Sequence, residues 1–249
     1  MGTPFRHILG IRFFTGGFEQ LLDHSLRAGL VVVPSAPVLV DLEGDPAHRA
    51  ALMESDFAIT DSGFFVLLWW LIRGERLPRI SGLRYLRGLL LRPEFRAPHA
   101  VFWIMPTQAD AEANSRWLQG IGIPVAPADC VVAPYYPAGA LVDEGLLQAI
   151  EAHRPEFVMI NLGGGVQERL GHFLRRRLSY KPTLVCTGAA IAFLSGRQAS
   201  IPVWADRLIL GWLLRLLNAP GRFLPRYVKA LRLPFLLLEE SVPSDSSTL

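Results

Sequence analysis

The segment FVMINLGGGVQERLGHFLRRRL, residues 157–178, joins a short apolar run to a basic, helix-length segment through three consecutive glycines. An apolar run of this length that ends in glycine is typical of a buried strand, and the segment after it predicts a helix. Such a turn presents backbone N–H groups and the positive end of a helix dipole to the space above the sheet. The segment therefore predicts one βα unit of a parallel sheet, with a candidate anion site at its turn.

Similar apolar runs alternate with helix-length segments along the chain, which predicts βαβ units and an α/β fold: a Rossmann-like parallel sheet with flanking helices. Helices are expected over 106–120, where Gly120 suits the helix end, and over 139–154, which Pro155 terminates. The expected strands are residues 29–35, 57–60, 100–106, 123–127, 157–163 and 182–190.

The pattern changes after about Gly196, where leucines and aromatic residues are interrupted by prolines and interleaved with arginines. This pattern predicts two or three short amphipathic helices, which form a C-terminal basic helical appendage. We therefore expect a core over residues 1–196, the appendage over 197–240 and a flexible polar tail over 241–249.

Composition excludes several classes of protein. The 51% hydrophobic content is ample for a large core. The two cysteines form no CxxC pair and the histidines show no H-x-x-x-H spacing, so we expect no disulfide framework, no metal site and a cytoplasmic location. We find no export signal, and the apolar stretch 63–72 is too short for a membrane span, which needs about 20 residues.

Charge is distributed unevenly along the chain. Residues 169–238 contain twelve lysines and arginines and one acidic residue, Asp206. This asymmetry suggests an anionic partner: a phosphate ligand, an anionic membrane surface or nucleic acid. The apolar content of the appendage favours lipid, and no recognised nucleic-acid-binding module is present.

The glycine turn does not match known nucleotide fingerprints. Glu168 interrupts the G-x-G-x-x-G pattern of dinucleotide sites, and no G-K-[ST] follows, so a P-loop is excluded. Gln167 and Glu168, in the first helical turn, are expected to point into the same space as the glycine N–H groups. The alternative is that the glycines only permit a tight turn.

Asp61 follows the apolar run 57–60 and precedes a glycine that opens an apolar helix, a position where open α/β sheets place functional side chains. Its carboxylate is a candidate general base for a sugar hydroxyl, and the alternative is a helix N-cap. Arg79 lies in a loop before the next helix and is a candidate phosphate ligand. The acidic DLEGD stretch, residues 41–45, is interpreted as a solvated loop.

Four blocks of the sequence carry a resemblance to a known family: SDFAITDSG (55–63), RISGLRYL (79–86), NLGGGVQERL (161–170) and IPVWADRLILGWLLRLLNAPGRFLPRY (201–227). Their order and spacing resemble the motifs of the WecG/TagA/CpsF family of bacterial glycosyltransferases over nearly the whole chain. The resemblance implies metal-independent, inverting transfer of a sugar from a UDP-sugar to a polyprenyl-diphosphate-linked saccharide at the inner face of the membrane, with no cofactor.

The resemblance also assigns roles to residues. It makes Asp61 the catalytic base and Arg79 a diphosphate ligand, and it places the arginines of the appendage near the pyrophosphate of the acceptor or the leaving UDP. The expected substrate-binding residues are Ser35, Arg79, Gly163, Gly164, Gly165, Gln167, Glu168, Arg215, Arg222 and Arg226.

Several positions depart from the family pattern. Val33 and Ser35 stand where the family has T-x-N, Arg84 replaces the acid of G-x-D-L, Gly165 replaces the proline of P-K-Q-E, and Gly211 replaces the glutamate of L-E-W. A divergent member with a different sugar or acceptor is therefore expected. The alternative is a non-catalytic member that binds a lipid-linked intermediate or a partner enzyme, and homo-oligomerisation stays open.

Overall fold

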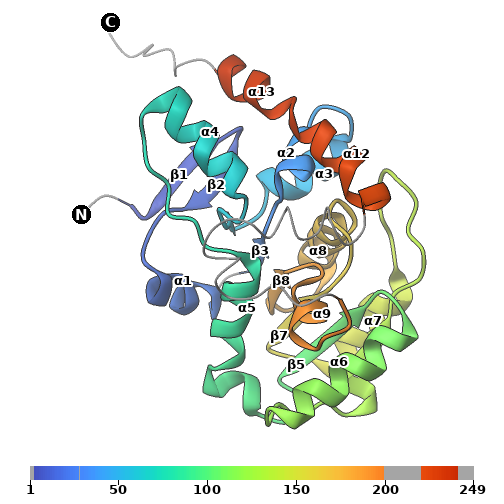
Figure 1. Ribbon diagram of the computed structural model, residues 1–249. Coiled ribbons are helices and arrows are strands. Elements are labelled where there is room, and N and C mark those ends of the chain that lie inside the picture. Colours follow the sequence, from blue (N-terminus) through green and yellow to red (C-terminus); the bar gives the residue numbers. More distant parts are fainter. Residues whose placement is uncertain (1–2, 28, 199–219, 241–249) are drawn as a thin grey trace, which may run out of the picture.

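The computed structural model describes residues 3–27, 29–198 and 220–240. Its centre is an eight-stranded sheet in the order β1-β2-β4-β3-β8-β7-β5-β6, parallel throughout except for the antiparallel pair β1 and β2 (Figure 1). The fold is thus the predicted α/β class. The strands are β1 Phe5–Ile8, β2 Ile11–Phe14, β3 Leu30–Val32, β4 Phe57–Ala58, β5 Val101–Met105, β6 Cys130–Val132, β7 Phe157–Ile160 and β8 Thr183–Cys186.

Two features of the sheet differ from the sequence prediction. Residues 123–127 form no strand, and the strand that borders β5 begins only at Cys130, because Pro124 and Pro127 lack the N–H that a ladder requires. The hairpin of β1 and β2 was not predicted. It turns through Leu9 and Gly10, whose φ angles are 53° and 74°.

Helices cover both faces of the sheet. The two predicted helices are confirmed as α6 and α7. The helices are α1 Phe18–Ser25, α2 Ala36–Val40, α3 Pro46–Met53, α4 Gly63–Arg73, α5 Gly82–Leu90, α6 Gln108–Gly120, α7 Glu144–His153, α8 Val166–Arg177, α9 Ala190–Leu194, α12 Pro220–Ala230 and α13 Leu233–Glu239, with 3-10 turns η1 Pro93–Arg96 and η2 Pro127–Asp129.

Alternation along the strands divides the core into two layers. Val32 and Ile104 face a layer built with α2, α4, α7, α8 and the C-terminal helices. Val31 and Trp103 face the opposite layer, built with α1, α5, α6 and α9. Successive strand residues point to opposite faces, so one sheet holds two apolar cores.

The C-terminal helices belong to the first layer. Leu233 and Leu237 are fully buried in it. Helix α12 contacts α2, as Figure 1 also shows, and α13 contacts α2 and α4. The ends of this contact are ionic, since Lys229 pairs with Asp41 and Arg232 lies 3.0 Å from Glu43. The acidic 41–45 stretch is therefore a docking point for these helices.

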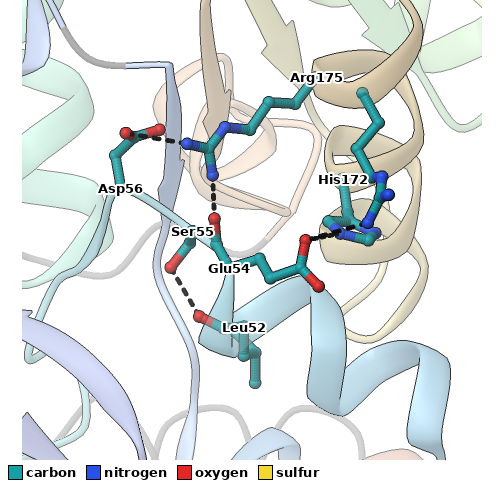
Figure 2. A network of polar contacts seen from close by, with 7 residues as sticks. Leu52, Glu54, Ser55, Asp56, His172 and Arg175 are labelled. Atoms are coloured by element: carbon teal, nitrogen blue, oxygen red, sulfur yellow. Dashed lines mark hydrogen bonds and ion pairs between the residues drawn. The ribbon is translucent and has the colours of Figure 1, made fainter.

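Much of the positive charge of α8 is also paired within the chain. Figure 2 shows Arg175, which lies 3.2 Å from Asp56 and also donates to the Glu54 carbonyl, and His172, which lies 2.9 Å from the Glu54 carboxylate. Arg176 joins the same carboxylate at 3.3 Å. These contacts fasten α8 to the segment between α3 and β4, so these cations serve the fold.

A candidate active-site cleft at the carboxyl edge of the sheet

A cleft of about 240 Å³ opens at the carboxyl ends of the central strands. Val33, Asp61, Pro106, Asn161 and Thr187 line it, each one to three residues after the end of a strand. The cleft forms because the helices that follow the neighbouring strands β3 and β8, namely α2 and α9, pack on opposite faces of the sheet. Open α/β sheets bind ligands at such a crevice.

The glycine turn after β7 forms part of the cleft wall. Gly163 and Gly164 line the cleft and are exposed. A Cβ on Gly164 would lie 2.6 Å from Val38 Cγ2, so the close approach of α2 requires glycine there. Gly165 has a φ of +89° and its N–H donates to Glu168 Oε2 at 2.6 Å. That N–H is taken within the chain, which leaves those of Gly163 and Gly164 as candidates for an anion.

Gln167 and Glu168 line the cleft, yet both side chains are buried and bonded within the chain. Gln167 Oε1 accepts the Gly188 N–H at 2.7 Å, and Gln167 Nε2 donates to Glu168 Oε1 at 3.0 Å. Burial raises the pKa of the Glu168 carboxyl above its ordinary value. These side chains therefore hold the two loops of the cleft together, and direct contact with a substrate stays a prediction.

Asp61 faces the cleft from the end of β4. Its Oδ1 accepts the N–H of Gly82 at 2.8 Å, at the first residue of α5. The N-cap interpretation is wrong for α4, because the side chain of Ser62 caps that helix by accepting the Phe65 N–H at 3.2 Å.

Arg79 lies beside Asp61. Its Nε donates to the Asp61 carbonyl at 3.2 Å, but its side chain is not part of the cleft wall formed by the described residues. Ser35 does line the cleft, at the N-cap position of α2. The structure thus brings Ser35 and Asp61 to one space and places Arg79 next to it.

The C-terminal helices reach the cleft through Arg226 of α12, which lines it. A Cβ on Gly164 would lie 4.0 Å from Arg226 Nη2, so the guanidinium sits over the glycine turn. Arg222 is on the same helix, and Arg215 lies outside the described residues.

Two cleft residues were not singled out from the sequence. Asn161 Oδ1 and Thr187 Oγ1 are buried and have no hydrogen-bond partner among the described residues. Buried polar atoms in folded proteins are nearly always satisfied, so unpartnered oxygens at a cleft mark places for ligand or water donors. Each residue follows a buried strand directly, which is the same signal that identified Asp61.

Asp110 and Asn114 of α6 also line the cleft and had no signal in the sequence. Asn114 Oδ1 accepts the Ser195 hydroxyl at 2.6 Å, and Asp110 lies 3.1 Å from Arg197 Nε. Polar residues inside a helix are ordinary solvent-facing residues by pattern, so only the packing of α6 beside α9 places them here.

The sequence model of the Glycosyl transferase WecG/TagA/CpsF family matches residues 6–246, nearly the whole chain. This range includes every cleft residue named above. No curated protein sequence matches the chain.

Proposed function

The chain belongs to the WecG/TagA/CpsF family of glycosyl transferases, and we propose that it moves a sugar from a UDP-sugar to a polyprenyl-diphosphate-linked saccharide, with inversion and without a metal ion in the transfer step. The observation that supports this most is the cleft itself. Among the residues that line it are Asp61, Arg226, and Asn161 and Thr187, whose buried side-chain oxygens have no hydrogen-bond partner in the described part of the chain.

In the proposed reaction, the Asp61 carboxylate accepts the proton of an acceptor hydroxyl as that oxygen attacks the anomeric carbon. The new glycosidic C–O bond forms on the face opposite the nucleotide, and the bond to UDP breaks with its electron pair on the leaving phosphate. The Gly82 N–H orients the carboxylate through its hydrogen bond to Oδ1. A positioned general base typically contributes about 10²–10⁴-fold to such a step.

The leaving UDP gains negative charge that the cleft must stabilise. Arg226 and the N–H groups of Gly163 and Gly164 border one stretch of the cleft, and we assign the diphosphate to it. Arg79, held beside Asp61, is the further candidate ligand. One well-aimed donor to a developing charge is worth about 3 kcal/mol.

A membrane surface is the proposed site of action, because a polyprenyl-linked acceptor resides there. No helix in the described part of the chain is long and apolar enough to span a membrane. The helices α4, α12 and α13 carry exposed apolar side chains, and α13 contacts α4, so we propose that this face enters the headgroup layer. We call it the apolar face, and its residues are Leu67, Trp70, Leu71, Leu224, Val228, Leu231, Phe235 and Leu238.

Thermal unfolding of the purified protein with UDP, a panel of UDP-sugars and NAD tests the donor. A ligand that binds only the folded state at about 100 times its Kd stabilises by about 2.7 kcal/mol. We expect UDP or one UDP-sugar to raise the melting temperature and NAD to have no effect.

The matched variants are Thr187→Val, which removes the unpartnered hydroxyl in the cleft, and Thr183→Val, at the amino end of the same strand β8. Only Thr187→Val should reduce the shift. If no nucleotide shifts unfolding, even with an acceptor analogue present, the donor assignment is wrong and the scaffold alternative gains support.

A further inference from the structure

Two histidines and an aspartate meet at the amino edge of the sheet, opposite the cleft. His99 precedes β5, Asp129 ends η2 directly before β6, and His153 ends α7 before β7. These strands are neighbours in the order β7-β5-β6. The three residues are far apart in sequence, and the order of the strands in the sheet brings their side chains together.

The distances suit a shared ligand. His99 Nδ1 lies 2.8 Å and His153 Nε2 lies 2.9 Å from the same oxygen, Asp129 Oδ1. The three ligand atoms all lie within 4.8 Å of one another. Zinc bonds of about 2.1 Å in a tetrahedral site separate ligand atoms by about 3.4 Å, so only a small spreading of the cluster would admit the ion.

The cluster is oriented by its surroundings. The Asp129 side chain is 1% exposed, and its Oδ2 accepts the Ala126 N–H at 2.7 Å, which fixes the carboxylate. The buried ring of Phe102 packs against His153 with 5.4 Å between centroids. His153 Nε2 is buried and makes no hydrogen bond among the described residues, so its short contact with Asp129 lacks hydrogen-bond geometry. The hydrogen bond from Ala126 to Asp129 and the packing of Phe102 on His153 are outer contacts of the kind that position the ligands of metal sites.

The backbone conformation of His99 and the helix dipole of α7 also support a metal site. His99, the ligand before β5, has a φ of 60°. Left-handed backbone at residues other than glycine costs free energy and concentrates at functional sites. His153 stands in the last turn of α7, whose negative dipole end favours a cation.

We propose that His99, Asp129 and His153 bind one Zn²⁺ ion, with the fourth position open to solvent on the side of His99, whose side chain is 60% exposed. Two imidazole nitrogens with one carboxylate suit zinc, whereas magnesium and calcium prefer oxygen ligands. The ion ties together the segments that precede β5, β6 and β7. It lies at the edge of the sheet opposite the cleft and takes no part in sugar transfer.

Calorimetric titration of the full-length chain, freed of any histidine tag, with ZnCl₂ tests this site. We expect one equivalent to bind and the melting temperature to rise. Loss of an outer-shell partner already weakens metal sites by about 10–100-fold, so His99→Ala and His153→Ala should each weaken binding by more than about tenfold. His7→Ala, an exposed histidine on β1, is the matched control and should bind as the wild type does.

Cobalt supplies a second readout, because Co²⁺ in a site with two imidazole ligands gives visible absorption bands that both variants should lose. Unfolding without metal shows whether each variant still folds, and the UDP-induced shift should persist in His99→Ala. The proposal is overturned if no stoichiometric binding occurs, or if zinc binds both variants as tightly as the His7→Ala control.

Discussion

Asp61 is the proposed base, and its Oδ1 accepts the Gly82 N–H. In Asp61→Asn the amide oxygen can still accept the Gly82 N–H, so fold and nucleotide binding should persist while the base is lost. We expect the rate of sugar transfer to fall by about 10²–10⁴-fold, with an unchanged UDP-induced shift in melting temperature. The control is Asp143→Asn, because Asp143 caps α7 and asparagine caps equally well. Transfer at the wild-type rate in Asp61→Asn would remove it as the base.

Adjacent glycines in the turn after β7 provide a matched pair. A Cβ on Gly164 would meet Val38 Cγ2 at 2.6 Å, whereas a Cβ on Gly163 has no atom of the described residues within 4 Å. Gly164→Ala should destabilise by about 1–3 kcal/mol through overpacking and should weaken nucleotide binding. Gly163→Ala should change the free energy of unfolding by less than about 0.5 kcal/mol. Urea denaturation of both variants measures the difference, and equal stabilities would contradict the close approach of α2.

Position after a strand was the sequence signal that located cleft residues. It identified Asp61 and the glycine turn, and it applies equally to Asn161 and Thr187. The hydrogen-bond partners of these side chains could not be predicted from their position after a strand. Glu168 lines the cleft as expected, but its hydrogen bond to the Gly165 N–H of its own helix start, where the φ of Gly165 is +89°, was not predicted.

The clamp between α8 and the segment after α3 has a predictable pH dependence. The hydrogen bond with His172 lowers the pKa of the Glu54 carboxyl, and Arg176 adds to this, against a smaller opposite effect of burial. Since the folded state lowers this pKa, the contribution to stability is present above the ordinary value of 4.5 and is lost as the pH falls through the folded value. The unfolded chain then binds the proton more readily than the native one.

We therefore expect Glu54→Gln to unfold at lower urea concentration than the wild type at about pH 6, and the difference to shrink at about pH 3.5. The effect should be below about 1 kcal/mol, because the pair is solvent-exposed. The matched control is Glu112→Gln, on the exposed side of α6, which should show no such pH-dependent difference. If the difference in urea unfolding between Glu54→Gln and the wild type stays constant with pH, the charge of Glu54 does not contribute to stability.

The apolar face can be tested without disturbing the core. Leu231, Phe235 and Leu238 are exposed, so their combined replacement by serine should leave thermal unfolding nearly unchanged. We expect flotation with anionic liposomes to be lost in this variant and retained in a triple serine variant of Leu91, Val132 and Val142. These residues are exposed, and they lie at the end of α5, at the end of β6 and before α7. Equal flotation of both variants would assign membrane binding to another surface.

Sequence patterns predicted elements best where burial decides the structure. Five expected strands were apolar runs, and each became a strand buried between two helix layers. The 123–127 run failed because two prolines outweigh its apolar content. The β1–β2 hairpin was missed because only Gly10 marks its turn in the sequence, and the other turn residue, Leu9, takes a left-handed conformation that leucine rarely adopts.

The distribution of charge in the folded molecule differs from its distribution along the sequence. The basic C-terminal third suggested an anionic partner, yet Arg175, Arg176, Arg177, Lys229 and Arg232 all pair with acidic residues from the first 150 positions. The sequence asymmetry is thus partly cancelled by folding, because segments far apart in sequence meet. Arg226 borders the cleft, where we assign the diphosphate.

The C-terminal helices are part of the folded core, because α13 is buried against it. Leu233 and Leu237 are fully buried, and each buried leucine contributes about 1.5–3 kcal/mol, whereas the exposed pairs of Lys229 and Arg232 add less than about 1 kcal/mol each. Removal of residues 220–249 should therefore lower the melting temperature and expose apolar surface to a hydrophobic dye, whereas removal of 241–249 alone should do neither.

If the chain ending at residue 219 unfolds as the full chain does, the contacts of α13 with α2 and α4 contribute nothing to stability. If it is destabilised as expected, a loss of transfer or membrane binding on truncation cannot be assigned to the helices' own chemistry, because the core beneath them is uncovered at the same time. Substitutions on the apolar face and at Arg226 then separate membrane contact and catalysis from folding.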